Sequence, residues 1–117
     1  MDAERIIGEF SGPEPGPLLI CFGGMHGNET AGIEALTILF ELIKNEPNLN
    51  PDFHFFGHMI GIRGNLQAIK AGRRYVQKDL NRQWTQDNVN RILSTPRHQL
   101  EAEDLEIADI LQLINQR

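Results

Sequence analysis

Residues 23–29 constrain this chain more than any other segment, because they join an apolar run to a long helical pattern. Their sequence, Gly-Gly-Met-His-Gly-Asn-Glu, follows five apolar residues at 18–22. Glycine adopts backbone angles that other residues resist, so the pattern predicts a sharp strand-to-helix turn. His26 and Glu29 stand three residues apart at the start of the predicted helix, where both side chains can lean toward one point. An imidazole and a carboxylate converging there would supply two of the three ligands of a His2Glu catalytic zinc site.

The flanking segments predict the fold class. The unalternating apolar run 18–22 is typical of a strand buried on both faces, and 53–62 is a second strand. Between them, apolar residues recur at helical spacing over 29–46, and Pro47 is expected to end that helix. Strand, helix and strand with short turns form a βαβ unit, so the two strands should be adjacent and parallel, with the helix covering one face. We therefore expect an α/β fold with a mixed or mostly parallel sheet and flanking helices.

The remaining segments are predicted less sharply. Residues 4–10 suggest a modest first strand, and 11–17 form a dense Gly/Pro turn signal. A short helix at 64–72 ends in glycine, and 73–84 is an irregular polar and cationic segment. Two weaker helical patterns follow, at about 86–94 and 100–115. The acidic residues at the start of the second pattern indicate a solvated helix face; they are Glu101, Glu103, Asp104 and Glu106.

Composition narrows the classes of function. A length of 117 residues suggests one domain, and 16 acidic against 11 basic residues argue against nucleic-acid binding. The single cysteine, Cys21, excludes an internal disulfide and indicates an inert buried thiol in a reducing compartment. Residues 1–10 carry acids and lack the apolar core of a signal peptide, and no run approaches a membrane span. A soluble, cytoplasmic protein is the expectation.

The other histidines are weaker candidates for a metal site. His54 and His58 would share one face of a strand but lie about 13 Å apart along it, too far to share an ion. His58 is better explained as packed or hydrogen-bonded, and His98 as a surface residue. Taken alone, His26 and Glu29 also fit a purely structural interpretation. They would then belong to a glycine-rich turn with a capping Glu near a helix start, favoured by the helix dipole.

Four motifs in order change that balance, because together they resemble one family. The chain carries Gly24-Met25-His26-Gly27-Asn28-Glu29, Gly64-Asn65-Leu66-Gln67-Ala68, Arg74-Tyr75 and Asp79-Leu80-Asn81-Arg82. From about residue 18 to 84 it resembles the succinylglutamate desuccinylase/aspartoacylase family, a branch of the zinc carboxypeptidase-like fold. A lone His-x-x-Glu occurs by chance on many helices, whereas four motifs at matching spacing are specific.

The resemblance implies a fold, an activity and site residues. It implies a zinc-carboxypeptidase-like (phosphorylase/hydrolase-like) sheet and zinc-dependent hydrolysis of the amide bond of an N-acyl amino acid. By position, His26 and Glu29 would bind zinc and Arg74 would polarise the scissile carbonyl. The substrate-binding residues would be Asn65, Asn81 and Arg82, with Asp79 supporting the metal ligands from behind. The chemistry suits these types, since guanidinium binds carboxylate bidentately and a cation stabilises an oxyanion.

One departure from the family pattern leaves two functions open, and a carboxypeptidase acting on peptides, which would share the ligands, is a third. The family's third zinc ligand, a histidine on a later strand, and its glutamate general base do not occur before Arg117. We therefore interpret residues 1–117 as the N-terminal part of one zinc-hydrolase catalytic domain, inactive by itself. The alternative is a non-catalytic, truncated domain that binds a small carboxylate or a partner chain. In either case, apolar surface exposed by truncation would favour self-association.

Overall fold

The computed structural model describes residues 2–117, which divide into two compact units. The first, called here the sheet unit, contains the residues up to Gly23 together with Ala31–Arg63. The second, called the helical unit, contains Gly24–Thr30 and Gly64–Arg117. The chain therefore passes into the helical unit directly after each of its two parallel strands, once for a short turn and once for the remainder of the sequence.

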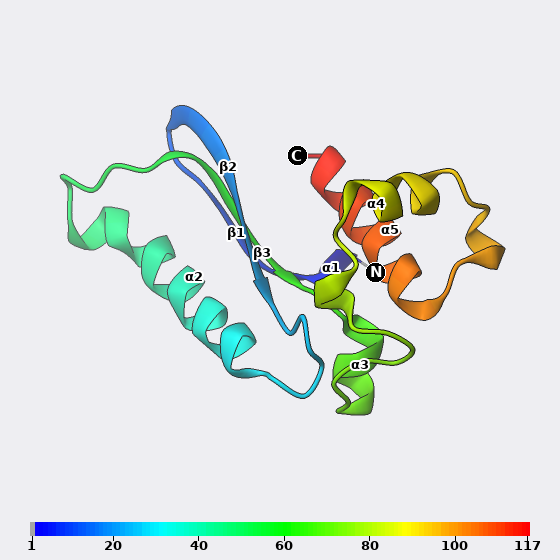
Figure 1. The fold of residues 1–117 in the computed structure, drawn as a ribbon. Helices are drawn as coiled ribbons and strands as arrows, with labels where there is room; N and C mark the ends of the chain where they lie inside the picture. The colour runs from blue at the N-terminus through cyan, green and yellow to red at the C-terminus, as the bar shows by residue number, and fades with distance from the viewer. Residues whose placement is uncertain (1) are drawn as a thin grey trace. The chain divides into compact units, whose positions relative to one another are not determined.

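The sheet unit confirms the predicted βαβ arrangement (Figure 1). Its elements in chain order are α1 (Asp2–Arg5), β1 (Ile6–Ser11), β2 (Glu14–Gly23), α2 (Ala31–Leu49) and β3 (Phe56–Arg63). The strand order is β1-β3-β2, with β3 parallel to β2 and antiparallel to β1. The parallel register runs from Leu18 opposite His58 to Gly23 opposite Arg63. The sheet is therefore mixed, as expected, with the central strand contributing fully buried Ile60 and Ile62.

Helix α2 lies along one face of the sheet and is anchored by Phe40 (Figure 1). Two strand glycines make room for this ring: a Cβ added at Gly8 would lie 2.6 Å from Phe40 Cγ. At Gly61 an added Cβ would lie 2.7 Å from Phe40 Cε2. The glycines thus let an aromatic ring approach the backbone of two neighbouring strands, which a larger residue at either position would prevent.

Prolines account for two differences from the predicted boundaries. Helix α2 continues past Pro47 to Leu49, and the Asn50 N–H still bonds the Glu46 carbonyl at 2.8 Å. Near a helix end, the one hydrogen bond that proline removes does not stop the chain from completing its last turn. Strand β2 likewise begins at Glu14, inside the segment predicted as a turn. It can hold Pro15 and Pro17 because β2 is an edge strand, where a missing N–H interrupts no ladder.

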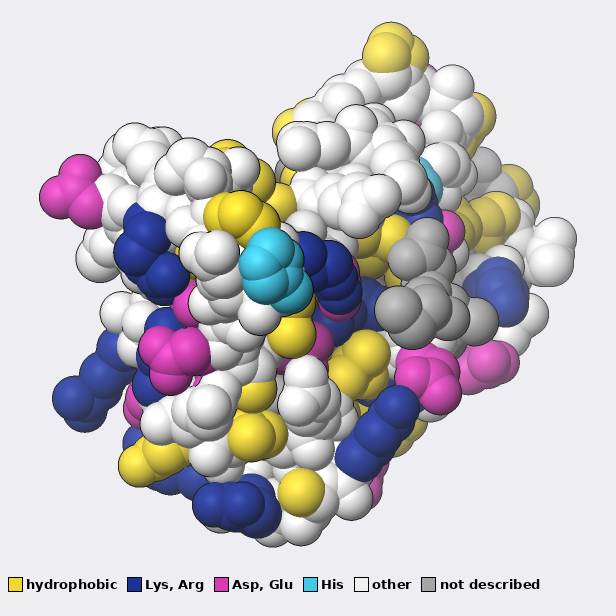
Figure 2. All heavy atoms as spheres, turned by 90° about the vertical axis from the view of Figure 1, so that its right-hand side faces the viewer, with side chains coloured by type: hydrophobic (Ala, Val, Ile, Leu, Met, Phe, Trp, Pro, Cys, Tyr) yellow, Lys and Arg dark blue, Asp and Glu magenta, His cyan; other side chains and the backbone are white. Residues whose placement is uncertain are grey.

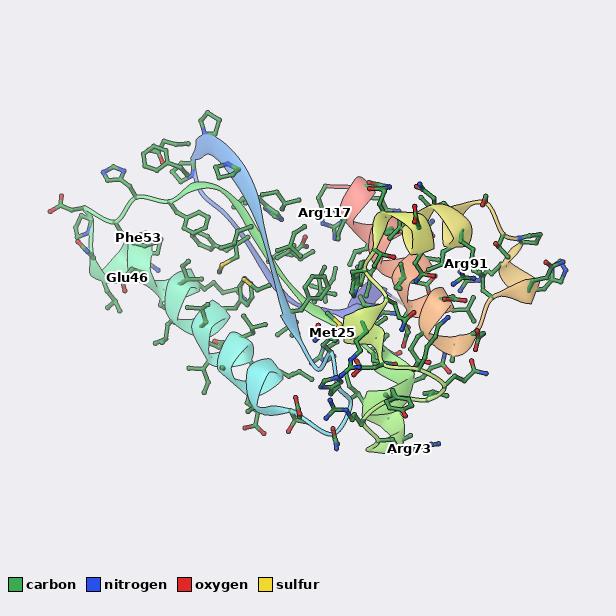
Figure 3. All side chains as sticks on the ribbon, viewed as in Figure 1. Met25, Glu46, Phe53, Arg73, Arg91 and Arg117 are labelled. Carbon is green, nitrogen blue, oxygen red and sulfur yellow. The ribbon has the colours of Figure 1, made fainter. Side chains whose placement is uncertain are left out.

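The helical unit is built around a small apolar cluster. Its elements are α3 (Leu66–Ala71), the 3-10 turn η1 (Leu80–Arg82), α4 (Gln86–Leu93), the 3-10 turn η2 (Arg97–Gln99) and α5 (Ala102–Asn115). Buried Leu80, Ile92 and Ile107 bring together η1, α4 and α5. Met25, labelled in Figure 3, and Trp84 pack against this cluster. The cluster therefore contacts two segments that carry family motifs: Gly24–Thr30 through Met25, and 73–82 through Leu80.

The helices near the predicted site also follow their sequence signals. Asn65 caps α3 through a side-chain bond to the Ala68 N–H, and Gly72 closes it in the left-handed conformation with φ of 64°. The predicted helices 86–94 and 100–115 appear as α4 and α5, shorter by one or two residues at the ends. Within the described residues, every helix falls short of the length or apolarity that a membrane crossing requires.

The packing of Phe40 against glycine generates a stability prediction. Replacing Gly61 by Ala should destabilise the chain by about 1–3 kcal/mol, because the new methyl group overlaps the Phe40 ring. Urea denaturation measures the loss. Combining Gly61→Ala with Phe40→Leu should cost less than the sum of the two single changes, since the smaller side chain relieves the overlap. Additive losses would show that the glycine is needed for another reason.

Candidate metal and substrate site

Two predicted site residues, Glu29 and Asp79, contact His26, and Arg74 and Arg82 lie beside Asp79. The turn that carries His26, Gly24–Thr30, packs against the segment after α3, and the Gly27 N–H bonds the Arg74 carbonyl at 3.1 Å. Gly27 is buried, and an added Cβ there would lie 2.2 Å from the Ala68 carbonyl carbon. Glycine is therefore required beside His26 for close backbone approach rather than for ligand contact. The turn and the 73–82 segment are held together by their main chains.

His26 has a carboxylate at each ring nitrogen. Its Nδ1 lies 3.4 Å from Glu29 Oε2, and its Nε2 lies 2.9 Å from Asp79 Oδ1. The His26 and Asp79 side chains are 13% and 16% exposed, whereas Glu29 is 64% exposed. The inner bond is therefore shielded from water, and the outer contact opens to solvent. The sequence spacing predicts that Glu29 approaches His26. The family resemblance predicts that Asp79 supports the metal ligands, and in the structure it contacts His26.

Asp79 divides its two oxygens between different partners. Oδ1 accepts from His26 Nε2 and from the Asn81 N–H at 3.0 Å, while Oδ2 lies 3.7 Å from Arg74 Nη2 and 3.8 Å from Arg82 Nε. Burial acts to raise the pKa of Asp79, but the His26 hydrogen bond, the Asn81 N–H and the nearby charges together lower it. The carboxylate is therefore ionised and accepts only, which makes His26 Nε2 the donor in that bond.

That protonation pattern determines what faces Glu29. In a neutral imidazole with the proton on Nε2, Nδ1 presents a lone pair, and Glu29 Oε2 presents another 3.4 Å away. Two acceptors facing one another are stabilised by a proton on Nδ1 or by a cation bound to both. Tetrahedral zinc with ligand distances of about 2.0–2.1 Å separates two ligand atoms by about 3.3–3.4 Å. The separation between His26 Nδ1 and Glu29 Oε2 fits that value.

The same geometry explains why Asp79 adds no third ligand. It contacts Nε2, on the opposite side of the ring from Nδ1. Among residues 2–117, no group of three His, Cys, Asp or Glu side chains is arranged to hold one metal ion. Of the other histidines, His58 bonds Ser11 and Glu9, His54 lies 3.5 Å from Glu14, and His98 is exposed. The hydrogen bonding predicted for His58 is confirmed.

The Arg74, Asn81 and Arg82 side chains are exposed, so solvent and ligands can reach them. Arg74 and Arg82 side chains are 52% and 81% exposed, and their contacts with Asp79 exceed hydrogen-bond length. Their guanidinium groups keep donors available for an anion. Figure 2 shows basic and acidic side chains interspersed on the face in view.

Asn65 has a different position from the one implied by the resemblance. Its side chain is fully buried, with Oδ1 accepting from the Ala68 N–H at 3.2 Å and Nδ2 donating to Glu103 at 2.9 Å. Contact with a substrate would require breaking those bonds. The structure therefore gives Asn65 a supporting position beneath the site.

The acidic start of α5 corrects a further expectation. Glu103 and Asp104 are fully buried and Glu106 is 3% exposed, so this is not a solvated helix face. Asp104 Oδ1 lies 2.7 Å from Lys78 Nζ and 2.8 Å from a guanidinium nitrogen of Arg91, which is labelled in Figure 3. Asp104 Oδ2 also accepts from the Glu101 N–H in a capping box. The spacing of Glu101 and Asp104 was the one sequence signal that could have indicated this role.

The fold and the site define an α/β protein with a histidine–carboxylate pair and exposed guanidinium groups beside it. The family model for the succinylglutamate desuccinylase/aspartoacylase catalytic domain matches residues 15–115. The chain therefore belongs to that family. The match includes the His26 motif and all of the helical segments that follow α3.

Individual relatives agree with this assignment. Succinylglutamate desuccinylase of Serratia proteamaculans is 39% identical over 72 residues, covering 60% of this chain and 20% of the relative. That of Photorhabdus laumondii is 36% identical over 81 residues, covering 68% of this chain and 23% of the relative. The crystal structure of the Chromobacterium violaceum enzyme matches the fold with a TM-score of 0.56 at 19% identity, covering 98% of this chain and 38% of that one. The chain thus spans about a fifth of these curated relatives.

The buried acids predict a loss of stability in acid. Burial acts to raise the pKa of both Glu103 and Asp104, yet their hydrogen bonds, and for Asp104 its cations, lower the pKa below the ordinary value. The unfolded chain therefore binds protons at a higher pH than the folded chain does, so stability should fall as pH drops below about 4–5. Urea denaturation across pH measures this slope.

Asp104→Asn provides the matched test of that prediction. It should reduce stability at neutral pH by about 2–3 kcal/mol, because Lys78 and Arg91 lose their shared counter-charge. It should also flatten the acid slope, since one titrating group is gone. An unchanged slope would assign the acid dependence to other carboxylates.

Proposed function

We propose that the chain forms part of a zinc-dependent amidohydrolase that cleaves the amide bond of an N-acyl amino acid. Its family membership supports hydrolysis, and the relatives named above are desuccinylases. The observation that carries the metal assignment is His26, whose Nε2 is held by Asp79 while Nδ1 faces Glu29. A carboxylate behind a metal-binding histidine fixes its ring and raises its basicity.

In this proposal the side chains divide into ligand, supporting and substrate groups. His26 Nδ1 and Glu29 bind zinc, and Asp79 keeps the His26 proton on Nε2. Zinc would supply a water of lowered pKa and a positive charge beside the scissile carbonyl. Arg74 donates toward the oxygen that becomes negative during amide cleavage. Completion of the ligand set and the general base requires groups outside these residues.

The exposed guanidinium groups select the substrate class. Arg82 has donors free to bind a carboxylate in a forked, two-bond arrangement, and Asn81 lies beside it in η1. Asp79 lies close enough to both arginines to orient them without using all of their donors. We therefore expect an acylated amino acid bearing at least one carboxylate. The single unpaired Cys21 suits the reducing conditions of the cytoplasm.

A non-catalytic alternative rests on a different observation, the apolar surface of the sheet unit. Exposed large apolar residues occur on β2, α2 and β3; they include Leu19, Phe22, Ile38, Leu42, Leu49 and Phe56. Contact with another chain would remove exposed apolar groups from water, which is favourable. Under this alternative the chain pairs with a second copy of itself or binds a small carboxylate through its arginines, without hydrolysis.

Enzyme kinetics test the two arginine roles in the complete hydrolase. Arg82→Gln should raise KM about 10–100-fold with a smaller change in kcat, because it removes a charged hydrogen bond to bound substrate. Arg74→Gln should mainly lower kcat, by about 100-fold, because its partner oxygen becomes negative only in the transition state. Arg73→Gln, at an exposed neighbouring position, serves as the control. Equal ground-state effects from both substitutions would contradict the assigned roles.

Metal analysis tests the ligand assignment in the 117-residue chain. Two protein ligands should bind zinc weakly, so the purified chain should hold far less than one zinc per molecule and lose residual binding in His26→Ala. His98→Ala removes an exposed histidine and should leave binding unchanged. Tight one-to-one zinc in a monomer would show that a third ligand had been overlooked.

Sedimentation tests the apolar surface independently. The chain should self-associate at raised concentration, and Leu42→Glu together with Phe56→Glu should weaken association by adding charge to exposed positions. A wild-type chain that sediments as a monomer throughout would argue against this surface as an interface.

A further inference from the structure

The most unusual buried group of the helical unit is the Glu103 carboxylate at the start of α5. It is fully buried and accepts four hydrogen bonds. Oε1 accepts from the Gln77 and Lys78 N–H groups at 2.9 and 3.0 Å. Oε2 accepts from the Val76 N–H at 2.8 Å and from Asn65 Nδ2 at 2.9 Å. All four donors are neutral amides, so the negative charge is stabilised by directed dipoles.

Three of these donors are consecutive in the chain, between Arg74 and Asp79. Residues 76–78 belong to no helix or strand, so no ladder of backbone bonds fixes their conformation. Buried or half-buried backbone N–H groups need partners, and one carboxylate provides them for the whole segment. Glu103 therefore holds the main chain between Arg74, which carries a guanidinium, and Asp79, which carries a carboxylate.

The fourth donor extends this control to the other half of the site. Asn65 Nδ2 bonds Glu103, and the Asn65 backbone N–H bonds the Gly24 carbonyl at 3.0 Å. Gly24 begins the turn that carries His26 and Glu29. A single buried acid is thus connected to both segments whose side chains meet in the His26–Asp79 bond.

We propose that Glu103 is a positioning residue, which sets the His26–Asp79 contact and the placement of Arg74 through the backbone of residues 76–78 and through Asn65. The inference rests on the proposed function for its consequence, since the contacts it sets are those assigned to metal and substrate. It concerns a residue outside the four sequence motifs and without contact to the site itself.

Glu103→Gln should disturb the segment, because both carboxylate oxygens of Glu103 are needed as acceptors. In Glu103→Gln one oxygen becomes an NH2 group, which cannot accept. If NH2 replaces Oε1 it faces the Gln77 and Lys78 N–H groups; if it replaces Oε2 it faces Val76 N–H and Asn65 Nδ2. Either orientation leaves two donors opposite a donor, so the segment must shift. Glu106→Gln is the matched control on the same helix, because its amide oxygen can still accept from the Gln67 N–H that Glu106 Oε1 bonds at 2.9 Å.

Nuclear magnetic resonance of the 117-residue chain without metal tests the inference. In Glu103→Gln, hydrogen exchange at Val76, Gln77 and Lys78 should accelerate about 10–100-fold relative to wild type. The ring-nitrogen shifts of His26 should move away from their wild-type values, as the Asp79 contact loosens. Glu106→Gln should leave the exchange of these amides and the His26 ring-nitrogen shifts as in wild type.

The remaining outcomes each decide the proposal. A folded Glu103→Gln chain with wild-type ring-nitrogen shifts of His26 would overturn it, and so would the same loss of the Asp79 contact in Glu106→Gln. If Glu103→Gln does not fold, Glu103→Asp keeps the charge on a shorter stem: a folded chain with altered His26 signals supports positioning. Unfolding of both variants would reduce Glu103 to a stability role.

The test separates this inference from the proposed function. Signals of His26 report the contact whether or not the complete protein hydrolyses amides. A loosened contact in Glu103→Gln with no hydrolysis by the complete wild-type protein would remove the proposed function alone. Hydrolysis in the complete wild-type protein with normal kcat and KM in Glu103→Gln would remove positioning alone.

Discussion

The helical unit depends on carboxylates that are buried at the first turn of α5. Burying a charge without partners would cost several kcal/mol, so each acid must find donors or cations. Glu103 takes neutral amide donors, and Asp104 takes Lys78, Arg91 and a backbone N–H. Their position at a helix start adds the favourable dipole of α5. The need to satisfy these groups ties α5 to α4 and to the irregular segment 73–82.

This arrangement gives an irregular segment the precision of a regular one. Loops usually carry functional side chains, while a rigid scaffold holds the loop in place. Here the scaffold is a helix that offers acceptors to the loop backbone, together with a cluster in which Leu80 is fully buried. Asp79 stands between these two anchors, one residue after Lys78 and one before Leu80. Its carboxylate is therefore directed at His26 from a backbone fixed on both sides.

The sequence predicted the sheet better than it predicted the support of the site. The apolar runs 18–22 and 53–62, with a helical pattern and short turns between them, predict a parallel strand pair. The strands pair as expected. The motif order also brought His26, Asp79 and the arginines together. In contrast, Pro47 predicts a helix end, but the helix continues to Leu49 because proline removes only one hydrogen bond of the last turn. The acidic pattern predicts a solvated face for Glu103 and Asp104, because periodicity shows which residues share a face and not which donors approach them. Such burial depends on residues 13 to 38 positions away.

The cations of the 73–82 segment differ in their partners, and these partners give them different roles. Lys78 lies against Asp104 and is 23% exposed, so its charge is neutralised within the unit. Arg74 and Arg82 reach Asp79 only at 3.7 and 3.8 Å and remain open to solvent. A chain with a net charge of −5 thereby keeps two guanidinium groups exposed beside the carboxylate that orients His26. Under the proposed function, attraction of an anionic substrate would depend on these local charges and not on the net charge, because solvent and salt screen distant groups within about 8–10 Å. Asp104, buried in α5, keeps Lys78 directed inward and so separates this structural cation from the two arginines that stay open to solvent.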